Sequence, residues 1–125
     1  MKDVLWSCLI VFVFGACANS NNDEQAWNTL NEALDELYNN NYKAYVNYVD
    51  SLDVEQVGED NFIEALKQKF NNKNDSVLFE LKDISDIDST QLLVKYQIVN
   101  VNSHDTTFCV QKMKKTDGLW KIKIR

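Results

Sequence analysis

The stretch SVLFELKDISDIDSTQLLVKYQIVNV, residues 76–101, decides the fold of this chain. In its first part, Val77, Phe79 and Leu81 alternate with Leu78, Glu80 and Lys82. A period of two is typical of a β-strand with one buried face. A longer strand is expected over residues 91–101, after a polar turn at residues 83–90. Apolar side chains lie on both faces of this longer strand, which predicts that part of it is covered on both sides. One face carries Leu92, Val94, Tyr96 and Ile98, and the other carries Leu93, Val99 and Val101.

Two further strands are expected toward the carboxyl end. A polar turn at residues 102–105 leads into a strand over residues 106–115. Thr116-Asp117-Gly118 is typical of a hairpin turn, because Gly118 can adopt a positive φ without a steric penalty. The last strand alternates between inward Trp120, Ile122 and Ile124 and outward Lys121, Lys123 and Arg125. The pattern predicts a four-stranded antiparallel meander.

Upstream of residue 76 the apolar residues follow a helical period. A first helix is expected to begin at Asn22 or Asp23, because both residue types cap helices. Its apolar stripe consists of Trp27, Leu30, Leu34, Leu37 and Tyr38. A second, short helix follows the turn at residues 39–41, and a third begins after a polar break at residues 51–58. Three helices ahead of a run of strands predict an α+β fold, with the helices packed on a curved four-stranded antiparallel sheet.

The amino-terminal segment VLWSCLIVFVFGAC, residues 4–17, carries no charge. It is shorter than the roughly 20 apolar residues that span a bilayer as a helix, and it ends in small residues, as a secretory signal does. Phe14-Gly15-Ala16-Cys17 resembles a bacterial lipobox, and this resemblance implies that the Cys17 thiol is acylated after cleavage. Two alternatives remain open. An ordinary signal peptidase could cut after Ala18, or the segment could be an uncleaved helix in a core.

The lipobox interpretation divides the chain into three parts. Residues 1–16 form a lipoprotein signal peptide, residues 17–25 a flexible tether, and residues 26–125 a single α+β domain. The tether is expected because its side chains are polar and turn-prone and have nothing to bury. We expect the protein to be lipid-anchored to the outer membrane of the cell envelope, facing the periplasm or the cell surface. A secreted soluble protein is the alternative.

Charge is distributed unevenly along the chain. The net charge is −6, yet residues 112–125 hold six basic side chains and a single acid. The acidic remainder argues against nucleic acid as a partner. The basic end is expected to be the solvated face of the last hairpin, where lysines discourage pairing between sheet edges. A strip that binds anions or lipid headgroups is the alternative.

Two short motifs resemble those of nuclear-transport-factor-like proteins. Residues 37–45, LYNNNYKAY, are similar to the family's helix, turn and Tyr-x-x-Ala-Tyr start, and residues 117–122, DGLWKI, are similar to its closing hairpin. The resemblance implies a cystatin-like α+β cone, in which a curved sheet wraps around a long helix and leaves a pocket at the open end. Many small bacterial lipoproteins of unknown function share this fold. It implies no single activity, because it hosts enzymes, binders and assembly modules.

Aromatic side chains are the candidates for lining such a pocket. Tyrosines recur at helical spacing around the first turn, and further aromatic residues occur on the strands. Packing in the core is the alternative for each of them. The ligand-pocket candidates are Tyr42, Tyr45, Phe79, Tyr96 and Trp120, and Phe108 is a further aromatic residue expected on the sheet side of the pocket.

Catalytic and metal-binding residues are sparse. His104 is the sole histidine and is expected in a surface turn. No Asp or His occupies an apolar strand position, where an isomerase of this fold would need its base. One histidine and one free cysteine do not make a metal ligand set, and no phosphate-binding loop occurs. We expect no enzyme, no metal and no cofactor, with an isomerase-like cone enzyme as the alternative.

Two functions follow from these observations. The first is a non-catalytic, membrane-anchored lipoprotein that binds a small apolar ligand or a partner protein of the cell envelope. The second is an assembly or inhibitor module that uses the outer face of the sheet and the basic carboxyl-terminal hairpin. The two differ in where apolar surface lies. A deep cavity lined by Tyr45, Tyr96 and Trp120 favours a ligand, whereas a filled cone with an exposed flat patch favours a protein.

Overall fold

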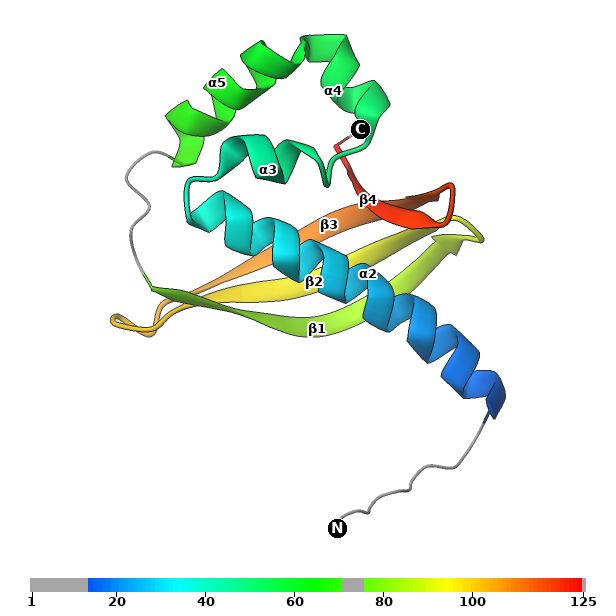
Figure 1. Ribbon diagram of the computed structural model, residues 1–125. Coiled ribbons are helices and arrows are strands. Elements are labelled where there is room, and N and C mark those ends of the chain that lie inside the picture. Colours follow the sequence, from blue (N-terminus) through cyan, green and yellow to red (C-terminus); the bar gives the residue numbers. More distant parts are fainter. Residues whose placement is uncertain (1–13, 71–75, 125) are drawn as a thin grey trace.

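The computed structural model describes residues 14–70 and 76–124, with side chains described from Asn22 onward (Figure 1). Four described helices precede four strands. The helices are α2 (Phe14–Tyr38), α3 (Tyr42–Val46), α4 (Ser51–Val57) and α5 (Glu59–Phe70), and the strands are β1 (Val77–Asp88), β2 (Gln91–Asn100), β3 (Thr106–Thr116) and β4 (Leu119–Lys123). The strands form one antiparallel sheet in the order β1-β2-β3-β4. The predicted α+β fold with a four-stranded antiparallel meander is confirmed.

The sheet has an inner face that packs against α2 and an outer face that points away from the helices. The register places Leu92 opposite Met113, and Met113 opposite Ile122, so these three side chains share the inner face. The core consists of Ala26, Leu30, Ala33, Leu34, Leu37, Tyr42, Tyr45, Val46, Val49, Val54, Leu92, Val94, Tyr96, Met113, Trp120 and Ile122. The apolar stripe expected on the first helix is therefore the side of α2 that meets the sheet.

Strand β1 is longer than its sequence pattern predicted. Residues 83–88, expected as a turn, continue the strand and pair with β2 as far as Asp88 opposite Gln91. The register shifts between Leu81 and Asp83, and again between Asp86 and Asp88. A bulge inserts one extra residue and so changes which residues face inward. Ile84 thereby returns to the inner face, opposite Val94.

Residues 51–57, expected as a polar break, form helix α4, so the prediction of three helices was wrong. The Asp50 side chain caps this helix by accepting a hydrogen bond from the backbone N–H of Leu52, 2.9 Å away. The segment before the cap pairs with the free edge of β4. The Ile122 N–H donates to the Tyr48 carbonyl at 2.7 Å, and the Asp50 N–H donates to the Ile122 carbonyl at 2.9 Å. This contact covers one edge of the sheet and fixes the start of α4.

Helix α2 begins at Phe14 rather than at Asn22 or Asp23. The residues expected as a flexible tether, 17–25, are therefore helical in the full chain, and the Lys115 ammonium donates to the Asn22 side chain at 3.4 Å. The division into signal, tether and domain stays a prediction, because residues 1–13 and the Cys17 side chain lie outside the described part. In that part, no helix has the length and apolarity needed to cross a bilayer.

Candidate functional site

Four of the five aromatic pocket candidates are buried in the core, and the fifth, Phe79, is partly buried and packs against it. Tyr42, Tyr45, Tyr96 and Trp120 are each exposed by 8% or less. Tyr96 packs on Trp27 with ring centroids 6.0 Å apart, and Phe79 packs on Tyr38 at 5.3 Å. Burial raises the pKa of Tyr45 to about 12 and also raises the pKa of Tyr96. These phenols are held neutral in apolar surroundings, which is the behaviour of packed core tyrosines.

Hollows occur at the two ends of the inner face. Trp120 lines one of about 280 Å³ between the amino end of the described α2 side chains and the β1–β2 turn. Phe79 lines another of about 470 Å³ at the carboxyl end of α2. Neither hollow is lined by Tyr42, Tyr45 or Tyr96. The structure thus separates the five candidates into three core residues and two residues that each border a different hollow.

The hollow beside Trp120 has polar walls. Asp23, Asp86 and Asp88 line it together with Lys115, whose ammonium lies 5.8 Å from the centre of the Trp120 ring. Partial burial and the nearby negative charges of Asp86 and Asp83 raise the pKa of Asp23. Across residues 14–70 and 76–124, no cluster of three His, Cys, Asp or Glu side chains is placed to hold a metal ion. Such walls do not suit a small apolar ligand, because charged groups lose hydration on contact with it.

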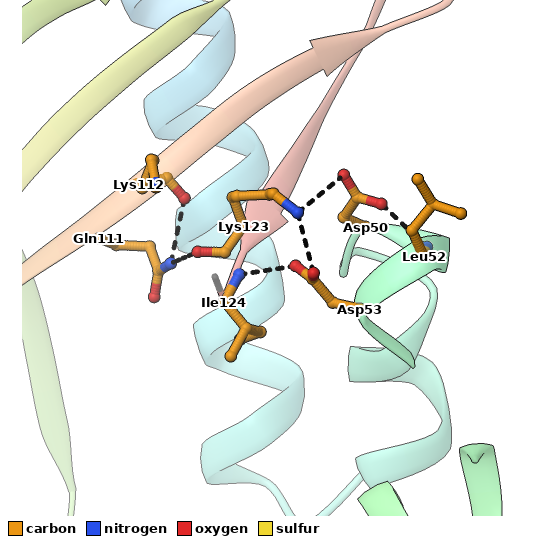
Figure 2. Close-up of polar contacts among 7 residues, drawn as sticks. All are labelled: Asp50, Leu52, Asp53, Gln111, Lys112, Lys123 and Ile124. Atoms are coloured by element: carbon orange, nitrogen blue, oxygen red, sulfur yellow. Dashed lines mark hydrogen bonds and ion pairs between the residues drawn. The ribbon is translucent and has the colours of Figure 1, made fainter. Parts of the chain in front are cut away.

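A buried ion pair, which sequence reasoning missed, joins β4 to α4 (Figure 2). The Lys123 ammonium lies 2.9 Å from an Asp53 carboxylate oxygen and 3.9 Å from Asp50. The other Asp53 oxygen accepts a hydrogen bond from the Ile124 N–H at 2.8 Å. Lys123 was expected to point into solvent with its neighbours on the last strand. The acid-rich run at residues 50–53 was its only signal in the sequence.

The outer face of the sheet carries an apolar patch. We call Leu78, Val99, Phe108 and Val110 the outer patch. Phe108 is 74% exposed, Val110 61% and Leu78 57%. The register makes them neighbours, because Leu78 lies opposite Val99, and Val99 and Phe108 lie on adjacent strands one pair apart. The described helices lie on the opposite side of the sheet, so the patch is in contact with solvent (Figure 1).

Two sequence-based expectations are therefore wrong at this face. Phe108 points outward and does not line the interior of the cone. Among the described residues, no helix covers the second apolar face of β2, and Val99 is only half-buried. The apolar residues on both faces of β2 suggested that both faces are covered. The alternation of a strand alone, however, does not say whether a second layer of structure packs on its other face.

Charged side chains of opposite sign flank the outer patch. Glu80 and Asp83 lie on the outer face of β1, where the register sets them opposite Gln97 and Lys95. Lys112 and Lys114 lie on the outer face of β3, opposite Leu93 and Gln91. Between these two groups, β2 carries Lys95 and Gln97 on the same outer face, so polar side chains also lie among the apolar ones.

Comparison with known proteins identifies the fold. No family model and no curated protein matches this chain. It is similar to an NTF2-like protein of Campylobacter jejuni whose name proposes a transpeptidase activity, with 13% identity, a TM-score of 0.63, and coverage of 77% of this chain and 94% of that one. It is also similar to an NTF2-like protein of unknown function from Shewanella oneidensis MR-1, with 18% identity, a TM-score of 0.59, and coverage of 81% and 93%. The chain has an NTF2-like fold.

Proposed function

We propose that this NTF2-like chain is a non-catalytic, membrane-anchored lipoprotein of the cell envelope that binds a partner protein through the outer face of its sheet. The exposed Phe108 at the centre of the outer patch carries this proposal. Soluble proteins seldom leave an aromatic residue and several aliphatic residues together in water unless the surface binds something. Aromatic side chains also contribute much of the binding energy at protein interfaces.

Packing inside the cone supports a protein partner over a small apolar ligand. The tyrosines that would line a deep cavity fill it instead, and the hollow beside Trp120 is walled by charges. An isomerase-like activity has little support as well. The carboxylates of that hollow have no tyrosine among the other lining residues to act with them.

The anchoring part of the proposal rests on the lipobox-like sequence ending at Cys17. Wild-type protein is expected to incorporate a labelled fatty acid, and Cys17→Ala is expected to lose the label entirely, because the thiol is the acceptor. Cys109→Ala serves as the matched control and should retain full label, since that cysteine lies on β3. Gel fluorescence after metabolic labelling measures the outcome. Equal label in wild type and Cys17→Ala would rule out this anchor.

The partner-binding part can be tested by placing a photo-crosslinking phenylalanine analogue at position 108 in cells that make the protein. Adducts are expected at position 108 but not with the same analogue at Leu52, a 58% exposed residue on α4, away from the sheet. Excess wild-type chain should suppress these adducts and excess Phe108→Ser should not, because only the former offers the intact surface. Equal crosslinking at both positions, or none at position 108, would contradict binding at the outer face.

A further inference from the structure

We propose that the hollow beside Trp120 binds a phosphoethanolamine group, in which an ammonium lies two carbons from a phosphate. This hollow, called the Trp120 hollow below, is lined by residues of α2 and of the inner face of the sheet and is separate from the outer patch. A membrane lipid is the source of the group that its position favours. The lipid source rests on the proposed function, through the anchor at Cys17, whereas the chemistry of the hollow is independent of that anchor.

Part of the wall of the Trp120 hollow carries negative charge that no cation of the described chain neutralises. Asp23 and Asp86 line it, and within the described residues neither forms an ion pair or accepts a hydrogen bond. Partial burial and the nearby charge of Asp86 both raise the pKa of Asp23. Asp88 differs, because its carboxylate accepts two hydrogen bonds from Thr90. An ammonium that enters the hollow therefore meets two carboxylates with oxygens available to accept from it.

The same hollow carries a cationic group. The Lys115 ammonium lies 3.4 Å from the Asn22 side-chain oxygen and 5.8 Å from the centre of the Trp120 ring. Neither contact neutralises the lysine, because the amide and the ring are both uncharged. Lysine binds phosphate as a point charge with rotatable N–H donors. The hollow thus combines a place for an anion with a place for a cation.

The indole N–H of Trp120 requires a hydrogen-bond acceptor. Trp120 is 6% exposed, and its Nε1 atom has no partner among the described residues. Buried N–H groups nearly always have an acceptor, so a donor without one at the wall of a hollow indicates that a ligand supplies it. An ammonium cannot do so, because it has no lone pair. The ligand must therefore carry an acceptor oxygen as well as a cation.

These requirements define a compact zwitterion. The hollow measures about 280 Å³, near the lower limit for ligand pockets, so it suits a group of headgroup size. A polyamine lacks an acceptor for the Trp120 N–H, and inorganic phosphate lacks a cation for the carboxylates. Phosphate suits the donors better than carboxylate does, because its oxygens point in tetrahedral directions and those of a carboxylate lie in one plane. The donors come from three elements: Lys115 from β3, Trp120 from β4 and Ser89 from the β1–β2 turn.

The Trp120 hollow lies at the end of the domain nearest the proposed anchor. Cys17 and Asn22 are both in α2, where a rise of about 1.5 Å per residue separates them by roughly 7.5 Å along the helix. The β1–β2 and β3–β4 turns lie at this end too, since the Lys115 N–H donates to the Thr90 carbonyl at 2.7 Å (Figure 1). The polar layer on each side of a bilayer is roughly 5 to 8 Å deep. A chain acylated at Cys17 therefore holds the hollow at the level of the lipid headgroups.

Calorimetric titration of the full chain in nonionic detergent with O-phosphoethanolamine tests the chemistry of the hollow. Asp23→Asn and Lys115→Gln are each expected to weaken binding about tenfold, because each removes one charge that pairs with the ligand. Glu55→Gln, at an exposed acid on α4, is the matched control and should bind as wild type does. Absence of saturable binding to wild type, or equal binding by wild type and both site variants, would overturn the proposal.

Ligands that carry half of the group divide the contributions. Ethanolamine, which lacks the phosphate, and β-alanine, which has a carboxylate in its place, are each expected to bind about tenfold more weakly than O-phosphoethanolamine. In nuclear magnetic resonance spectra, the Trp120 indole N–H signal should shift with O-phosphoethanolamine and stay in place with ethanolamine, which brings no phosphate oxygen to it. Trp120→Phe assigns that signal by its loss. Equal affinity for β-alanine, or an indole signal that O-phosphoethanolamine does not move, would contradict the phosphate assignment.

Carbodiimide coupling in vesicles distinguishes a lipid headgroup from the free compound. The reagent joins a primary amine to an adjacent carboxylate as an amide, with loss of water, and mass spectrometry locates the product. In vesicles of phosphatidylethanolamine and phosphatidylglycerol, the full chain is expected to gain the lipid at Asp23 or Asp86 and not at Glu55. Phosphatidylcholine in place of phosphatidylethanolamine is the control, because its quaternary amine cannot couple. Saturable binding of O-phosphoethanolamine without a lipid adduct, or equal adducts at Glu55, would overturn the lipid source.

The outcomes separate this inference from the proposed function. Fatty-acid label at Cys17 without binding of O-phosphoethanolamine would overturn the inference and leave the anchor standing. Binding without fatty-acid label would overturn the anchor and support the chemistry of the hollow. Crosslinking at Phe108 is independent of both, because that residue lies on the outer face.

Discussion

Asp53→Ala is expected to lower the free energy of unfolding by about 3 kcal/mol, the lower end of the range for breaking a buried ion pair. The Asp53 side chain is 3% exposed and that of Lys123 is 18%. Removal of the Asp53 carboxylate leaves the Lys123 ammonium with the more distant Asp50, at 3.9 Å. It also removes the acceptor of the hydrogen bond that the Ile124 N–H donates. We choose the lower end because Asp50 remains and Lys123 is partly in contact with water.

Urea unfolding followed by tryptophan fluorescence measures this loss, and two further variants divide it. Asp53→Asn keeps an oxygen for the Ile124 N–H but not the charge, so it should lose less than Asp53→Ala. Glu55→Ala, on an exposed position of the same helix, is the matched control and should change stability by about 0.5 kcal/mol or less. A loss for Asp53→Ala no greater than the control's would mean that the pair behaves as a surface salt bridge.

Leu30→Ala is also expected to cost about 3 kcal/mol of unfolding free energy, by a different mechanism. Leu30 has no exposed surface and lies in the middle of the face of α2 that packs on the sheet. Truncation removes buried methyl groups and leaves a cavity that the surrounding strands fill only in part. Alanine keeps the helix propensity high, so the loss is one of packing rather than of helix formation.

Leu78→Ala is the matched control for Leu30→Ala and should change stability by about 0.5 kcal/mol or less. It deletes the same atoms from a side chain that is 57% exposed on the outer patch. The same urea titration, read in detergent at a protein concentration where the chain is monomeric, compares the two. Equal losses would mean that Leu78 is part of the core and would remove a member of the outer patch.

Residues whose local pattern matched their surroundings were predictable. The stripe at Leu30, Leu34 and Leu37 and the alternation at Trp120 and Ile122 gave the correct helix and strand and the correct buried side. Predictions failed where the environment of a residue depends on a helix or strand distant in the sequence. Helix α4 was missed although Asp50, which caps it, directly precedes it, because the Lys123 partner of its Asp53 lies 70 residues further along the chain.

The sequence by itself determined the class of fold, the order of the strands, the buried face of α2, and the burial of Trp120 and Ile122 on β4, because periodicity reports which side chains share a face. It did not place Lys123 and Ile124, since Lys123 is paired with Asp53 and Ile124 is 51% exposed. Only the tertiary structure decided what covers each face. Bulges in β1 changed its alternation, the segment before α4 closed one sheet edge, and no described element covered Phe108. Periodicity identifies a face that is apolar, but burial of that face requires another surface, and the outer patch lacks one within the described chain.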